Sequence, residues 1–163
     1  MRATISLYLR AVHPGRSEEE HQAAFTALAT TPGTGAAGGL VAAMLACFAK
    51  ARVVNGMDYV SRLIDLEALI AESSVVCTGE GSLDSQTLGG KVVSKIQSLC
   101  AKHGKPLFVI CGTNKLAGAI GPNVEVHDLV SNFGLEDSLN RAGHCLQRLM
   151  AEKVAQRICS HLH

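Results

Sequence analysis

Hydrophobic positions fall in two patterns along the chain, short continuous runs and stripes at helical spacing. Continuous runs at 74–77 and 106–111 predict buried strands, because a strand of a parallel sheet is covered on both faces. Residues 124–130 predict a third strand, and the β-branched and aromatic positions of residues 3–9 predict another near the N-terminus. We therefore expect a mostly parallel sheet.

Helices are predicted between and after these strands. Ser17, followed by three glutamates, is typical of an N-cap with an acidic first turn. The predicted helices cover residues 17–28, 36–50, 57–71 (as two short helices), 89–103 and 135–162. This alternation predicts an α/β fold, a three-layer sandwich around a mostly parallel sheet, in a single unit of residues 1–163.

The composition limits which kinds of binding partner and compartment we expect for this protein. The 15 Lys and Arg residues nearly balance the 14 Asp and Glu residues, so no net field favours nucleic acid or an anionic membrane. The six cysteines lack the two-residue spacing of zinc sites, and their place in apolar runs favours free thiols in a reducing compartment. The sequence contains no run of roughly 20 apolar residues, the length that a membrane-spanning helix needs. We expect a soluble cytoplasmic protein.

The segment TGEGSLDSQTLGGK, residues 78–91, follows the first buried run directly. Ligands of open α/β sheets bind at the carboxyl ends of strands, where loops and helix N-termini meet. Gly79 and Gly81 let the backbone approach a ligand closely, and exposed N–H groups before a helix can bind an anion. A phosphate group is the ligand that this segment predicts.

Charged side chains in the same segment suit phosphoryl transfer. Glu80 and Asp84 offer one carboxylate for a magnesium ion and one to accept a proton, and Lys91 could neutralise a phosphate. The polar side chains that could donate to substrate oxygens are Ser85, Gln86 and Thr87. The alternative is a solvated surface turn without a ligand.

A second glycine-rich stretch gives a competing interpretation. Gly33, Gly35 and Gly38 match the dinucleotide fingerprint G-x-G-x-x-G, and Asp58 lies 20 residues further on. Pro32 and polar threonines stand where the fingerprint requires a buried strand, so the context argues against it. A glycine loop that packs closely against a neighbour is the alternative to nucleotide binding.

Both stretches, in this order and spacing, resemble motifs of the type 1 glycerate kinase family. The likeness rests on residues 32–40 (PGTGAAGGL), residues 78–87 (TGEGSLDSQT) and Gly90-Lys91, and it continues through Lys105-Pro106 to residues 135–139. The resemblance implies ATP-dependent phosphorylation of D-glycerate, with 2-phosphoglycerate as the product in most members and Mg²⁺ as cofactor. It also implies a two-domain α/β fold whose active-site cleft includes residues 78–91.

The resemblance covers the C-terminal part of that family, less than half of a full enzyme, and residues 1–30 match it poorly. We therefore expect a half-site that does not readily close over ATP, so activity of this chain alone is not assured. Self-association is expected through the surface that the missing half would cover. A catalytically silent nucleotide-binding module and an assembly domain stay open as alternatives.

Overall fold

The computed structural model describes residues 2–84, 92–116 and 120–162. Contacts divide the chain into two compact units, residues 1–55 and 56–163. Each unit has its own buried core and is described by itself, and the single unit over 1–163 stays a prediction. Among the described residues, no helix has the length and apolar character needed to cross a membrane.

The first unit is helical. Its elements are α1 (Arg2–Val12), α2 (Glu18–Thr30), the 3-10 turn η1 (Ala36–Gly39) and α3 (Leu40–Cys47). Ile5 and Leu9 of α1 are buried against Ala42 and Ala46 of α3. The strand predicted at residues 3–9 is therefore wrong: Ile5 and Leu9 lie one helical turn apart, and their packing outweighs the local strand propensity.

Helix α2 begins as predicted. The Ser17 hydroxyl accepts from the Glu20 N–H at 3.2 Å, and the Glu20 carboxylate accepts from the Ser17 N–H at 2.7 Å. This reciprocal pair is a capping box, and the hydrogen bond from the Ser17 backbone is the main cause of the lowered pKa of Glu20. The helix predicted over 36–50 is shorter, because left-handed residues delay its regular start to Leu40.

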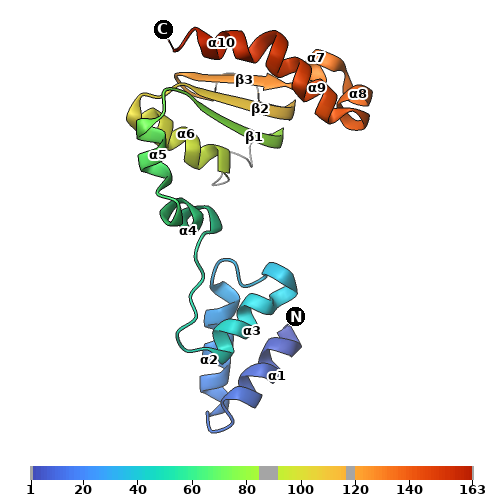
Figure 1. The fold of residues 1–163 in the computed structure, drawn as a ribbon. Helices are drawn as coiled ribbons and strands as arrows, with labels where there is room; N and C mark the ends of the chain where they lie inside the picture. Colours follow the sequence, from blue (N-terminus) through green and yellow to red (C-terminus); the bar gives the residue numbers. More distant parts are fainter. Residues whose placement is uncertain (1, 85–91, 117–119, 163) are drawn as a thin grey trace. The chain divides into compact units, whose positions relative to one another are not determined.

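The second unit contains a three-stranded parallel sheet (Figure 1). Its strands, in the spatial order β1-β2-β3, are β1 (Val76–Leu83), β2 (Leu107–Asn114) and β3 (Val124–Asp128). Two helices precede the sheet in the chain, α4 (Gly56–Leu63) and α5 (Leu66–Glu72), and α6 (Val92–His103) connects β1 with β2. After β3 come α7 (Leu129–Phe133), α8 (Leu135–Asn140), α9 (Ala142–Leu149), the π-helical η3 (Met150–Val154) and α10 (Ala155–Cys159).

Alternating side chains of β2 fill a core on each side of the sheet. Leu107, Val109 and Cys111 pack with residues of α5 and α6, whereas Phe108 packs with Leu129 and other residues of α7, α9 and η3. Figure 1 shows α5 and α6 on one side of the sheet and α9 and α10 on the other. The predicted three-layer α/β fold is confirmed in this unit.

Several sequence-based boundaries are wrong in this unit. The strand predicted over 124–130 ends at Asp128, because its carboxylate caps α7, and the strand predicted over 106–111 continues to Asn114. The predicted terminal helix over 135–162 is divided at Arg141, whose φ of −134° and ψ of 33° lie outside the helical region. Strand β1 extends to Leu83, beyond the predicted end at residue 77. Pairing with β2 carries the strand through glycines that have low strand propensity of their own.

Candidate functional site

The carboxyl end of β1 carries the first part of the TGEGSLD segment. Gly79, Glu80 and Gly81 lie within the strand, where the sequence predicts a turn, and Asp84 follows the strand directly. The predicted site residues Ser85, Gln86, Thr87 and Lys91 lie outside the described residues. The structure thus places Glu80 and Asp84 on one strand end, four residues apart, at the edge where ligands of parallel sheets bind.

Strand β1 changes its alternation near Gly81. The Val76 N–H donates to the Pro106 carbonyl at 3.0 Å, and the Leu83 carbonyl accepts from the Lys115 N–H at 2.8 Å, so both residues direct backbone groups toward β2. In a regular strand, residues seven apart direct these groups to opposite sides. Val76 and Leu83 also pack into the same core cluster. One irregular step must therefore lie between them.

A glycine on the facing strand allows this step. Within β1, Gly81 alone has no register partner in β2, and Gly112 stands opposite it between two paired positions. A Cβ atom at Gly112 would lie 2.6 Å from the carbonyl oxygen of Gly81, which is a steric clash. The close approach of these two backbones reorients the last residues of β1 immediately before Asp84.

The Glu80 carboxylate turns back onto its own strand. Its Oε1 atom accepts from the Gly81 N–H at 3.0 Å. Glu80 and Asp84 are both half-buried, and they supply hard oxygen donors of the kind that Mg²⁺ prefers. Among the described residues no group of three or more His, Cys, Asp or Glu side chains is arranged to hold a metal ion. Metal binding by Glu80 and Asp84 stays a prediction.

Neighbouring strands bring further polar residues to the same edge. The Asn114 side chain accepts from the Leu116 N–H at 3.0 Å after β2, and the Asp128 side chain caps α7 by accepting from the Ser131 N–H at 2.8 Å. Burial raises the pKa of Cys111 to about 11, and the Asp128 charge adds to this shift. Cys111, 2% exposed, is a core thiol that is protonated at neutral pH.

Sequence analysis missed Gly112, Asn114 and Asp128 as parts of this edge. Gly112 had a signal, since a glycine inside a predicted buried strand indicates a close approach of backbones. The position of Asp128 beside Cys111 depends on the register of β2 and β3, which local patterns do not contain.

The second glycine-rich stretch lies in the first unit, after helix α2 instead of a strand. The dinucleotide fingerprint therefore lacks the strand that it requires, as the sequence context indicated. Gly33 has a φ of +87°, and a Cβ there would lie 3.2 Å from the Val53 side chain. Gly38 has a φ of +68°, whereas Gly35 has a φ of −74° and open space around its Cα.

A cavity of about 320 Å³ borders this stretch. Backbone of Gly38 and Gly39 forms part of its wall, and most of the remaining wall is apolar, including Ile5 and Leu40. The stretch thus combines close packing at Gly33 with an open face at Gly38. Binding by Gly33, Gly35 and Gly38 stays a prediction.

Comparisons with known proteins connect these features. A model of the glycerate kinase family matches residues 13–163. The glycerate 2-kinase of Escherichia coli K12 is 40% identical over 82 residues, which are 50% of this chain and 21% of that protein. A glycerate kinase of Halalkalibacterium halodurans is 29% identical over 136 residues, which are 80% of this chain and 34% of that protein.

A solved structure agrees with these sequence matches. A Salmonella typhimurium LT2 protein assigned as glycerate kinase 2 aligns with a TM-score of 0.55 and 29% identity, over 90% of this chain and 42% of that one. The chain therefore spans well under half the length of these relatives. The family match nevertheless includes β1, its glycines and both carboxylates. The chain belongs to the glycerate kinase family.

Proposed function

We propose that this chain takes part in the ATP-dependent phosphorylation of D-glycerate, with 2-phosphoglycerate as the product. One observation carries the proposal: Glu80 lies in the carboxyl half of a parallel strand and Asp84 directly follows that strand, within the stretch matched by the family. Such an edge favours phosphate binding through backbone N–H groups. The relatives named glycerate kinase support this substrate class.

The proposed reaction transfers one phosphoryl group. A hydroxyl oxygen of D-glycerate bonds to the γ-phosphorus of ATP, the bond from that phosphorus to the β–γ bridging oxygen breaks, and ADP leaves with its electron pair. The hydroxyl proton passes to a carboxylate, a role that we assign to Asp84, with Glu80 as the alternative. Lys91 is assigned to a phosphate oxygen.

With Asp84 as the proton acceptor, a magnesium ion would be held by the Glu80 carboxylate, and in the alternative assignment by Asp84, because carboxylate oxygens fit its preference for hard ligands. When bound, the ion would neutralise negative charge on the phosphates. The hydrogen bond from the Gly81 N–H occupies one oxygen of Glu80 and fixes its orientation. Removal of Mg²⁺ by a chelator is expected to abolish turnover, measured as product formed per enzyme.

The test is incubation of the chain with ATP, Mg²⁺ and D-glycerate, followed by separation of 2-phosphoglycerate from 3-phosphoglycerate. We expect Asp84→Asn to lower kcat by at least about 100-fold, because the proton acceptor is lost. Asp137→Asn is the matched control, since Asp137 is an exposed aspartate on α8. Unchanged turnover in Asp84→Asn would remove Asp84 from the mechanism.

ATP binding is measured separately by titration. ATP binding without product would favour the catalytically silent nucleotide-binding module over the kinase. Binding of NAD in place of ATP would favour the fingerprint at Gly33, Gly35 and Gly38.

We also propose that the chain self-associates. Support comes from large apolar side chains that are exposed in the second unit, including Val60, Leu63 and Ile64 of the α4 region. Surfaces of this kind frequently mark contacts between proteins. Light scattering after size exclusion would measure the mass, and a monomer at all concentrations would contradict the proposal.

We also propose that the protein is located in the cytoplasm. All six cysteines are free thiols, and Cys100, Cys111 and Cys145 are buried in the cores. Free thiols persist in a reducing compartment. Fractionation of cells that express the chain would test its location.

A further inference from the structure

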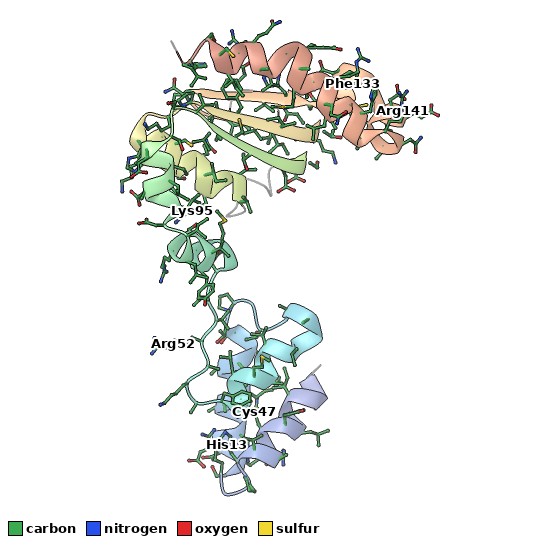
Figure 2. The ribbon with its side chains drawn as sticks, in the orientation of Figure 1. His13, Cys47, Arg52, Lys95, Phe133 and Arg141 are labelled. Carbon is green, nitrogen blue, oxygen red and sulfur yellow. The ribbon has the colours of Figure 1, made fainter. Side chains whose placement is uncertain are left out.

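A polar cavity of about 300 Å³ lies between helices α4, α5 and α6, all in the second unit. None of its lining residues belongs to β1, and Figure 2 marks Lys95, one of the lining residues. The other lining residues are Asp58, Ser61, Arg62, Asp65, Glu67 and Leu99. Three carboxylates and two cationic groups therefore surround one small volume.

Side chains of α6 pair with two of the three carboxylates. Lys95 donates to Asp58 at 2.9 Å and is the main cause of the lowered pKa of Asp58. Glu67 pairs with Lys102 and with His103, and the hydrogen bond from Lys102 is the main cause of its lowered pKa. The carboxylates of Asp58 and Glu67 are thus already matched by cations of α6.

One charge of each sign in the lining makes no close ion pair among the described residues. Arg62, in the last turn of α4, and Asp65, just before α5, form no ion pair within 4 Å in the part of the chain that the structure describes, although the Arg62 charge contributes to the lowered pKa of Asp58. Both belong to the lining of the cavity. A ligand that satisfies both must carry a negative and a positive group.

Ser61 adds a second, independent observation. Its side chain is more than nine-tenths buried, with 8% of the residue exposed, and it belongs to the cavity lining. Its Oγ atom has no hydrogen-bond partner among the residues that the structure describes. Buried hydroxyl groups normally have a partner, so this one is available to a bound group.

We infer that this cavity binds a small zwitterion, of the size and charge pattern of an α-amino acid. The ligand carboxylate accepts from Arg62 and from the Ser61 hydroxyl, and the ligand ammonium donates to the Asp65 carboxylate. A simple anion would meet three carboxylates, and a simple cation would leave Arg62 unmatched. The ligand would connect α4 with the start of α5, which Asp65 precedes.

Three matched probes test the inference by calorimetric titration of the whole chain: free glycine, acetate and methylammonium. Free glycine carries both charges, and each of the other two carries one. We expect glycine to bind at least about tenfold more tightly than either single-charge probe, because only glycine engages Arg62 and Asp65 together. Equal affinity for acetate and glycine would overturn the inference, as would absence of glycine binding up to about 20 mM.

Variants assign the binding to this cavity. Arg62→Gln and Asp65→Asn should each weaken glycine binding about tenfold or more, and Ser61→Ala by a smaller factor. Asn tolerates the left-handed backbone of Asp65, whose φ is +48°, so Asp65→Asn should keep the fold. Arg141→Gln is the control, on the opposite layer of the sheet, as Figure 2 shows. Unchanged binding in folded Arg62→Gln, checked by circular dichroism, would overturn the inference.

Discussion

Glycine is needed for different physical reasons in the loop after α2 and where β1 meets β2. In the loop after α2, Gly33, Gly38 and Gly39 adopt φ values of +87°, +68° and +95°, which L-residues rarely adopt. In β1 no described glycine has a positive φ. The limit there is space, and it lies on the facing strand β2, where a Cβ at Gly112 would come too close to the carbonyl of Gly81, whereas a Cβ at Gly81 would meet nothing within 4 Å. Similar composition therefore predicts different sensitivities to substitution, one set by backbone conformation and one by space.

The largest effect is expected where space is the limit. Gly112→Ala should lower the free energy of unfolding by about 3 kcal/mol, because its Cβ would lie 2.6 Å from a backbone oxygen that cannot rotate away. Urea denaturation of the purified chain measures this. Gly143→Ala is the control: Gly143 lies in α9 with open space around it, so alanine should leave stability unchanged or raise it. Equal effects of the two substitutions would show that the close approach is absent.

A smaller effect is expected where conformation is the limit. Gly38→Ala should cost about 1 kcal/mol, because its φ of +68° is unfavourable for alanine although nothing lies within 4 Å. Gly35→Ala, three residues earlier at a φ of −74°, should be close to neutral. Thermal unfolding of both variants separates the two cases. A greater loss in Gly35→Ala would reverse the assignment of conformational strain.

The pH dependence of stability tests a contact in the second unit, between Glu125 of β3 and Arg157 of α10. Arg157 donates to both carboxylate oxygens of Glu125 at 3.0 to 3.1 Å, and this contact is the main cause of the lowered pKa of Glu125. A lowered pKa contributes stability above the ordinary value of about 4.3, and that stability is lost as the pH falls through the folded-state value.

We therefore expect the stability of the wild type to decrease more steeply than that of Glu125→Gln as the pH falls below about 4.3. The difference should stay below about 1 kcal/mol, since Arg157 is largely exposed. Denaturation curves at a series of pH values measure it. Parallel curves for the two proteins would show that the Glu125 contact does not contribute to folding.

The smallest effect on stability is expected at Gly79. A Cβ there would meet the Ile110 carbonyl oxygen at 3.5 Å, an ordinary contact, so Gly79→Ala should change the free energy of unfolding by less than about 1 kcal/mol. If Gly79 serves phosphate binding, ATP affinity should fall while stability does not. If ATP affinity and stability are both unchanged in Gly79→Ala, Gly79 contributes neither to folding nor to ATP binding.

Local signals were sufficient for much of the fold. The Ser17 N-cap, the division of residues 57–71 into two helices and the buried run at 106–111 all appear in the structure near the predicted positions. Each depends on residues close together in the sequence, such as a capping hydroxyl or a helical stripe. The three layers follow from the alternation of these elements.

Other features required contacts between distant residues. Residues 3–9 have strand propensity but form a helix, because Ile5 and Leu9 pack on α3. The extension of β1 through Gly79 and Gly81 depends on its pairing with β2. The cavity near Lys95 joins residues of three helices that lie up to 41 positions apart, between Asp58 and Leu99.

The sequence by itself determined the family motifs, the carboxylates Glu80 and Asp84 and most helix starts, because these are properties of neighbouring residues. Only the tertiary structure decided where β1 ends, why Gly112 must lack a side chain and which charges near Lys95 form close ion pairs. The physical reason is that steric overlap and charge pairing depend on distances across the fold, and local propensity does not contain those distances.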